Sequence, residues 1–238
     1  MKRMRALLPL LVLVGIGVAL LASGTLSRFD PRHIAEQQAS LKALIAAHPL
    51  AAVLAQIGAI ALAISTGLPG AIVFVFAGGM LFGVLGGTVL STIGTTIGAS
   101  ALFLASRSAF SHGSGEPPAL VSRLRAGYHA YPLSYAMFLR LVPFFPFGGV
   151  TLALAWLRCP LWLFLLTTAL GGGVMIAFET ALGAGLTASI VRDGQVSLGV
   201  FAHPRVLLPL LGMAVLALTP IVLTQLRRRA RGGIAEKG

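Results

Sequence analysis

Residues 43 to 106 contain no Asp, Glu, Lys or Arg. A run of this length is too long for one transmembrane helix, which needs about 20 apolar residues, and is long enough for two or three passages. In the whole chain only 10% of residues are charged, whereas soluble domains carry roughly a quarter. Backbone groups inside a bilayer must bond to one another, as they do in a helix. The chain is therefore predicted to be an all-α integral membrane protein.

The sequence Gly67-Leu68-Pro69-Gly70 interrupts this apolar stretch. Proline lacks an amide donor and disfavours helix at the residue before it, while glycine tolerates open backbone. Irregular backbone at membrane depth is stable only where protein or trapped water surrounds it. We therefore expect a re-entrant hairpin with legs at about 50–66 and 71–82, its turn at Pro69 and Gly70, and a full span after it at about 84–106.

The same pattern occurs again in the second half of the chain. A leg at about 133–142 is followed by the break from Pro143 to Pro146 and a return leg at about 147–157. Residues 107–130 are polar and are predicted to form a loop. With long apolar runs at residues 6–27, 160–186 and 205–226, the expected architecture has about four transmembrane helices and two hairpins.

Basic residues predict the orientation, because cytoplasmic loops carry the excess of Lys and Arg. The basic segments are the N-terminal tail, residues 107–130 and the C-terminal tail, so both termini are expected in the cytoplasm. The two hairpins then enter from opposite sides, as in inverted-repeat transporters. This sidedness fails if either broken segment crosses the bilayer fully. Because the charges lie at the ends and between apolar runs, we expect the net charge of +12 to reflect orientation and not nucleic-acid binding.

Three regions are expected along the chain. Residues 1–49 comprise a first transmembrane helix, with a cleaved signal peptide as the alternative, and an amphipathic segment that lies on the membrane or forms a solvated linker. Residues 50–190 form the inverted-repeat core. Residues 191–238 comprise a last transmembrane helix and a basic tail.

Several glycines recur at intervals of four residues, which places small side chains on one helix face and permits close packing. Helix packing is the expected role, with a direct substrate role as the alternative. The glycines are Gly79, Gly83 and Gly87 in one set and Gly94 and Gly98 in another.

Two ionisable residues lie alone inside the second apolar region. Arg140 is the only charged residue between Arg125 and Arg158, and Glu179 is the only one between Arg158 and Arg192. Such residues normally face the bundle interior or a wet cavity. We expect Arg140 and Glu179 to share a polar cavity; the alternatives are that Arg140 reaches the membrane surface and that Glu179 stays protonated.

Chemical motifs for catalysis or cofactor binding are absent from the sequence. It has no phosphate-binding loop of the GxxxxGK type, and its histidines and single cysteine show no metal-ligand spacing. We therefore expect no cofactor, no metal and no enzymatic activity.

Residues 68–107, which contain Pro69-Gly70 and Ala77-Gly-Gly-Met-Leu-Phe-Gly83 and end at Arg107, resemble the SNARE-associated Golgi protein family, also called the VTT-domain or DedA superfamily. Residues 138–147, FLRLVPFFPF, are similar to its second motif, in which two prolines follow an arginine. The likeness covers about 50–190 and is closest to the Tvp-type bacterial membrane proteins. Thr151 stands where the family often has Asn, and Val174 where a Pro is usual.

The resemblance implies two inverted hairpins and movement of phospholipid or polyprenyl-phosphate between leaflets of a bacterial inner membrane. Arg140 and Arg107 would then meet the lipid phosphate, since arginine binds phosphate bidentately. Membrane lipids are the expected partners, and self-association into a homo-oligomer stays open. The alternatives are a secondary transporter of a small solute coupled to ions or protons, with Glu179 as its protonation site, and a membrane assembly factor that transports nothing.

Overall fold

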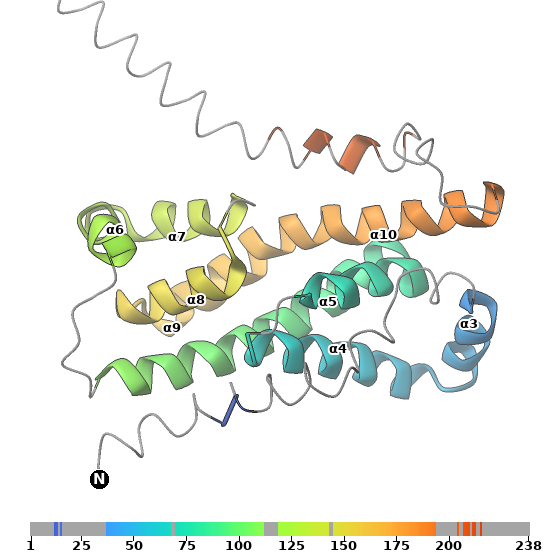
Figure 1. Ribbon diagram of the computed structural model, residues 1–238, viewed down its shortest axis with the longest axis horizontal. Helices are drawn as coiled ribbons and strands as arrows, with labels where there is room; N and C mark the ends of the chain where they lie inside the picture. Colours follow the sequence, from blue (N-terminus) through green and yellow to red (C-terminus); the bar gives the residue numbers. More distant parts are fainter. Residues whose placement is uncertain are drawn as a thin grey trace, which may run out of the picture.

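The computed structural model describes residues 37–67, 70–111, 119–142 and 145–193, with isolated positions between 12 and 15 and between 204 and 215. The predicted helix at residues 6–27, the predicted span at 205–226 and the basic tail lie outside these ranges, apart from the isolated positions. All regular structure in the described part is helical, as expected, and it contains no strand (Figure 1).

The first half of the described chain contains helices α3 (Gln38–Ala47), α4 (Pro49–Ser65) and α5 (Ala71–Ser111). The axes of α3 and α4 differ by 114°, and Pro49 begins α4, where its fixed φ suits the first helical turn. Helix α3 covers the second part of the predicted surface segment, and its Leu41 packs against Ala77 and Met80 of α5.

Helix α5 changes direction at Gly83, whose backbone angles are φ 74° and ψ 178°. A straight helix over the 40 residues from Ala71 to Phe110 would extend about 60 Å, twice the thickness of a hydrocarbon core. Instead the chain folds back at Gly83. The close approach of Gly87 to Gly78 shows this, since a Cβ added to Gly87 would lie 2.7 Å from the carbonyl of Gly78. Residues 71–82 therefore form the return leg of the first hairpin, and residues 84–111 form the long helix after it.

The second half begins with α6 (Ala119–Ala130), α7 (Pro132–Leu141) and α8 (Phe147–Trp156). The prediction of a loop throughout 107–130 was wrong: α5 continues to Ser111, and residues 119–130 are helical. Helix α6 forms because Val121 and Tyr128 are buried in the core next to α7 and α8, a tertiary contact that offsets its polar composition. The legs α7 and α8 lie close to the predicted positions.

The last long segment comprises α9 (Leu161–Thr167), a π-helical turn η2 (Thr168–Gly172) and α10 (Gly173–Asp193). Residues 161–186 are long and apolar enough to cross a membrane, as are residues 71–110, which Gly83 interrupts. These two segments contain the predicted spans at 84–106 and 160–186.

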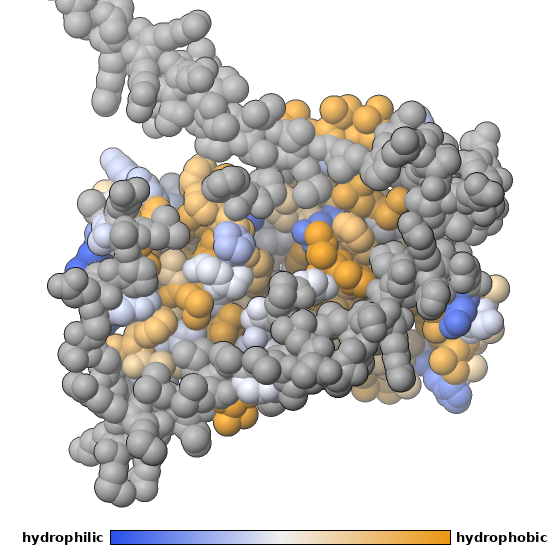
Figure 2. Space-filling model, viewed as in Figure 1, coloured by the Kyte–Doolittle hydropathy of each residue, from blue (hydrophilic) through white to orange (hydrophobic). Residues whose placement is uncertain are grey.

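The surface of the described chain suits a lipid environment. Large apolar side chains are widely exposed, with Leu85 at 80% and Trp162 at 65%. On the face in Figure 2, apolar residues are visible in the middle between the grey atoms, and hydrophilic residues lie towards the ends near α3 and α6 and at one place in the middle. In a soluble protein, exposed apolar area of this extent would promote aggregation. The protein is an integral membrane protein.

Gly83→Ala is expected to destabilise the fold. At φ 74° and ψ 178° the backbone is in a region used almost only by glycine, and another residue there costs about 1–3 kcal/mol. In the described part of the chain no atom lies within 4 Å of the added Cβ, so the expected effect is one of backbone strain. Thermal unfolding in detergent would measure it, with Gly58→Ala as control because Gly58 also has open space around it but lies within helix α4. Equal stability of both variants would contradict a break at Gly83.

Candidate functional site

The two halves of the described structure interlock, because the long helix of each half packs on the return leg of the other. Helix α10 lies against residues 71–82, since a Cβ on Gly79 would overlap the carbonyl of Thr180 and one on Gly183 would overlap that of Phe76. In the opposite sense, Ala99 and Phe103 of α5 share a core cluster with α8. Each half is thus incomplete without the other.

The other glycine set positions α4. Gly94 lies against Ile57 and Gly98 against Ala61, so α4 runs parallel to the second part of α5. Gly87 lies against Gly78, where the chain folds back. At Gly83 an added Cβ would meet no atom of the described chain within 4 Å. Gly83 forms the break itself, so the helix face that its spacing implies is not continuous there.

Arg140 lies near the end of α7 and points into the second hairpin. Its Nη2 donates a hydrogen bond of 3.2 Å to Thr151 Oγ1, and its guanidinium carbon lies 4.2 Å from the ring centroid of Phe147 and 5.1 Å from that of Phe164. Thr151 in turn donates to the carbonyl of Phe147 at 3.0 Å. Residues of α7, α8 and α9 therefore enclose this one charged group.

The guanidinium is buried but only partly satisfied. Arg140 is 5% exposed, and its Nε and Nη1 have no hydrogen-bond partner in the described part of the chain. A buried donor without a partner costs about 1–3 kcal/mol, and more when it is charged. Attraction to two aromatic faces offsets part of this cost. The arrangement has capacity for further hydrogen bonds to an acceptor.

Within the described residues, no hydrogen bond or ion pair joins Arg140 and Glu179, and the polar cavity that they were expected to share stays a prediction. Glu179 lies about two turns beyond η2 on α10, partly exposed, next to Thr180. The hydroxyl of Thr180 is 2.7 Å from that of Thr88 and so joins α10 to α5.

Arg107 lies at the exposed end of α5, where its Nη1 donates a 3.2 Å hydrogen bond to the carbonyl of Cys159. This carbonyl belongs to the short connection between α8 and α9, in which Arg158 has a positive φ of 55°. Arg107 thus bridges the long helix of the first half to the second hairpin.

Two of the four predicted turn residues lie in the described part of the chain. Gly70 has φ 105°, and Pro146 precedes α8 in extended conformation. Pro69 and Pro143 lie outside the described residues.

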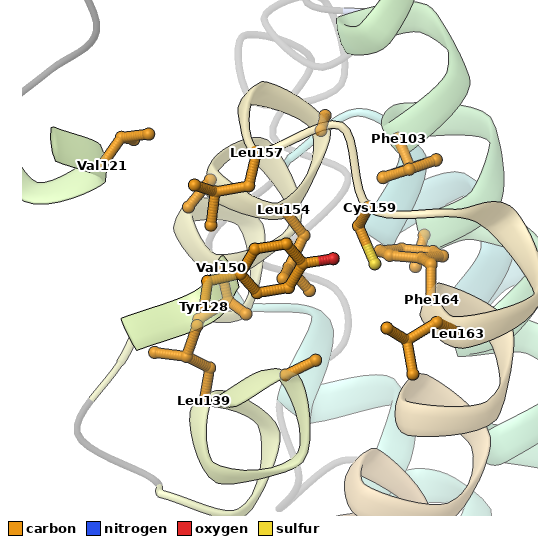
Figure 3. Packing of buried hydrophobic residues seen from close by; sticks show 14 residues of the cluster. Phe103, Val121, Tyr128, Leu139, Val150, Leu154, Leu157, Cys159, Leu163 and Phe164 are labelled. Carbon is orange, nitrogen blue, oxygen red and sulfur yellow. The ribbon is translucent and has the colours of Figure 1, made fainter. Parts of the chain in front are cut away.

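Cys159 borders the Arg140 site on the side of α6. In Figure 3 the hydroxyl of Tyr128 points toward the Cys159 sulfur, with Phe103 and Phe164 on the far side. These two rings stack with centroids 4.1 Å apart. Burial raises the pKa of the Tyr128 hydroxyl, so this group stays neutral and supplies no counter-charge to Arg140.

Three polar residues around the hairpins were not identified as site residues from sequence. Thr151 holds Arg140, Thr168 lies on η2, and Gln56 of α4 donates a 2.9 Å hydrogen bond to the carbonyl of Phe74 on the return leg. All three are uncharged polar residues in apolar helices, and threonine in such helices is common and mostly bonds its own backbone. The sequence drew attention only to Thr151, because the family often has Asn at that position.

The family model of the VTT domain matches residues 68–185. The chain belongs to the VTT-domain family. This is the domain of the SNARE-associated and DedA proteins, so the resemblance to that family is confirmed; the match is to the domain as a whole, and the Tvp-type branch stays a prediction. The match begins at the turn of the first hairpin and ends within α10, so it includes Arg140, Arg107 and Glu179. Comparison with curated proteins and with solved structures gave no significant match.

Proposed function

We propose that this VTT-domain protein moves lipids between the two leaflets of the membrane, as a transporter or scramblase of phospholipid or of polyprenyl-phosphate. Membership of the VTT-domain family supports a transporter-like membrane role in general. The lipid substrate is inferred from the properties of the Arg140 site and from the family likeness.

The observation that carries this proposal is a buried arginine without an acidic partner among its contacts. A cation in the interior of a membrane protein is costly and normally marks a substrate or ion pathway. A lipid phosphate would supply the missing charge and would accept hydrogen bonds from Nε and Nη1. Arg107 is exposed at the end of α5 and would meet the head group nearer the membrane surface.

The proposed arrangement is an inverted repeat in a bacterial inner membrane, with both termini in the cytoplasm. The reciprocal packing of each long helix on the other half's return leg supports the repeat, and the basic segments support the orientation. The hairpins would line the route that the head group follows.

Purified protein in vesicles with fluorescent phosphatidylglycerol, phosphatidylethanolamine or a polyprenyl phosphate would test the proposal. We expect labelled lipid to change leaflets faster than in protein-free vesicles. The proposal is wrong if none of these lipids moves faster than in the control.

A proton-coupled transporter of a small solute is the second candidate, because Glu179 is partly buried in a membrane-length segment and has no ion pair within the described residues. In this case flux would depend on a pH gradient and would be lost in Glu179→Gln, whereas leaflet exchange of lipid would stay at the level of protein-free vesicles.

A further inference from the structure

The side chain of Arg140 lies along one face of α9 and η2. A Cβ added to Gly171 would be 3.0 Å from the Cβ of Arg140, and the guanidinium carbon is 5.1 Å from the ring centroid of Phe164. Thr168 follows Phe164 by about one helical turn and begins η2, the element that contains Gly171. Since η2 packs on α7, which carries Arg140, Thr168 belongs to a segment that borders the guanidinium site.

The hydroxyl of Thr168 is fully buried and makes no hydrogen bond within the described part of the chain. A threonine in a helix normally bonds a carbonyl three or four residues earlier. The adjacent Thr167 does so, with its hydroxyl 2.8 Å from the carbonyl of Leu163. The π-helical turn begins at Thr168, and turns of this kind are frequent at functional sites.

The unsatisfied groups of Arg140 and Thr168 have a common chemistry. Arg140 Nε and Nη1 are charged donors, and the Thr168 hydroxyl rotates to donate or accept. No carboxylate is among the recorded contacts of Arg140. Thr151 is already engaged, because it accepts from Arg140 and donates to Phe147, so it holds the guanidinium in place. A positive site with donors remaining fits an anion with several acceptor oxygens.

We propose that the Thr168 hydroxyl binds the same phosphate group as Arg140, and that η2 aims this hydroxyl at the ligand. The inference rests on the proposed lipid function and adds a neutral donor beside the charged one. The shared chemistry is the phosphate group, whether a lipid or inorganic phosphate carries it. Because Arg140 is 5% exposed, the phosphate enters only when the second hairpin shifts.

Binding measurements on the full-length protein in detergent would test this. The ligands are inorganic phosphate and short-chain dihexanoyl phosphatidylglycerol, and the variants are Thr168→Val and Thr167→Val. We expect Thr168→Val to weaken binding about tenfold, as for loss of a hydrogen bond to a charged group. Thr167→Val should bind like the wild type, since the Thr167 hydroxyl is already bonded inside α9. Thr168→Ser keeps the hydroxyl and should also bind like the wild type.

The outcomes separate this inference from the lipid function. Equal affinity of Thr168→Val and Thr167→Val, or no binding of either ligand to the wild type, would overturn the role of Thr168 even if the protein moves lipid. Binding that depends on Thr168, without lipid movement in vesicles, would retain the site and reject the lipid function.

The two ligands identify the source of the phosphate. If Thr168→Val weakens binding of the lipid alone, the lipid head group is the ligand. If it weakens binding of both ligands, the phosphate group is sufficient. If Thr168→Val does not fold, Thr168→Ala removes the same hydroxyl with less bulk.

Discussion

Replacing Arg140 with methionine is expected to slow lipid movement at least tenfold while leaving the protein folded. Methionine keeps contact with the rings of Phe147 and Phe164, which favour sulfur as a neighbour. It also removes two buried nitrogens that have no partner in the described chain, so the melting temperature should stay close to that of the wild type or rise. A charge-assisted contact with phosphate stabilises the transition state by about 1.5–3 kcal/mol, so its loss should slow lipid exchange about tenfold to hundredfold.

Arg125→Met is the matched control, because Arg125 is an exposed arginine on α6. Its lipid exchange should equal that of the wild type. Arg140→Lys should fall between Arg140→Met and the wild type, since lysine keeps the charge but lacks the planar donors. Wild-type exchange rates in Arg140→Met would exclude Arg140 from the transport pathway. A large loss of melting temperature in that variant would instead assign Arg140 a structural role.

Gly79→Ala should give the largest loss of stability. The added Cβ would overlap the backbone carbonyl of Thr180, and neither group can rotate away because both belong to helix backbones. Helix α10 must then move off the return leg of the first hairpin. Overpacking of this kind typically costs about 1–3 kcal/mol, and we expect a value near the upper end. Thermal unfolding and the fraction of monodisperse protein in detergent would measure the change.

Gly58→Ala serves as the reference for this experiment. Gly58 is an exposed helical glycine of α4 with no atom within 4 Å of an added Cβ, so alanine there should be neutral or stabilise the helix by up to about 1 kcal/mol. Gly183→Ala should resemble Gly79→Ala, because its Cβ would overlap the carbonyl of Phe76 on the same interface. If the Gly79→Ala and Gly58→Ala variants have the same melting temperature, α10 does not pack on the return leg of the first hairpin as described.

Local signals predicted the helical legs well. Helix α4 was expected at about 50–66 and extends from Pro49 to Ser65, and α8 was expected at about 147–157 and extends from Phe147 to Trp156. Proline and glycine disrupt helices through their own backbone geometry, so their effect is visible without knowledge of any neighbour. The isolated charges at Arg140 and Glu179 were also visible from sequence, because a charged residue in an apolar segment is recognised without knowledge of its neighbours.

Features that depend on neighbours were not predictable. Helix α6 was expected to be a loop, since its formation depends on burial of Val121 and Tyr128 against other helices. Gly83 was assigned to packing because spacing does not distinguish a glycine on a helix face from a glycine at a break. Arg140 was expected to share a polar cavity with Glu179, and the sequence did not indicate that Thr151 would accept a hydrogen bond from it.

The apolar runs, helix-breaking residues and isolated charges required a broken-helix membrane protein, because hydrophobicity and backbone restriction act on each segment separately. The contacts between those segments were determined only by the tertiary structure: α10 packs on the first return leg, and two aromatic rings and Thr151 surround Arg140. Such contacts join different segments of the chain and depend on where both backbones fold back. No local property of Arg140 encodes its surroundings, which result from the packing of α7 on α8, α9 and η2.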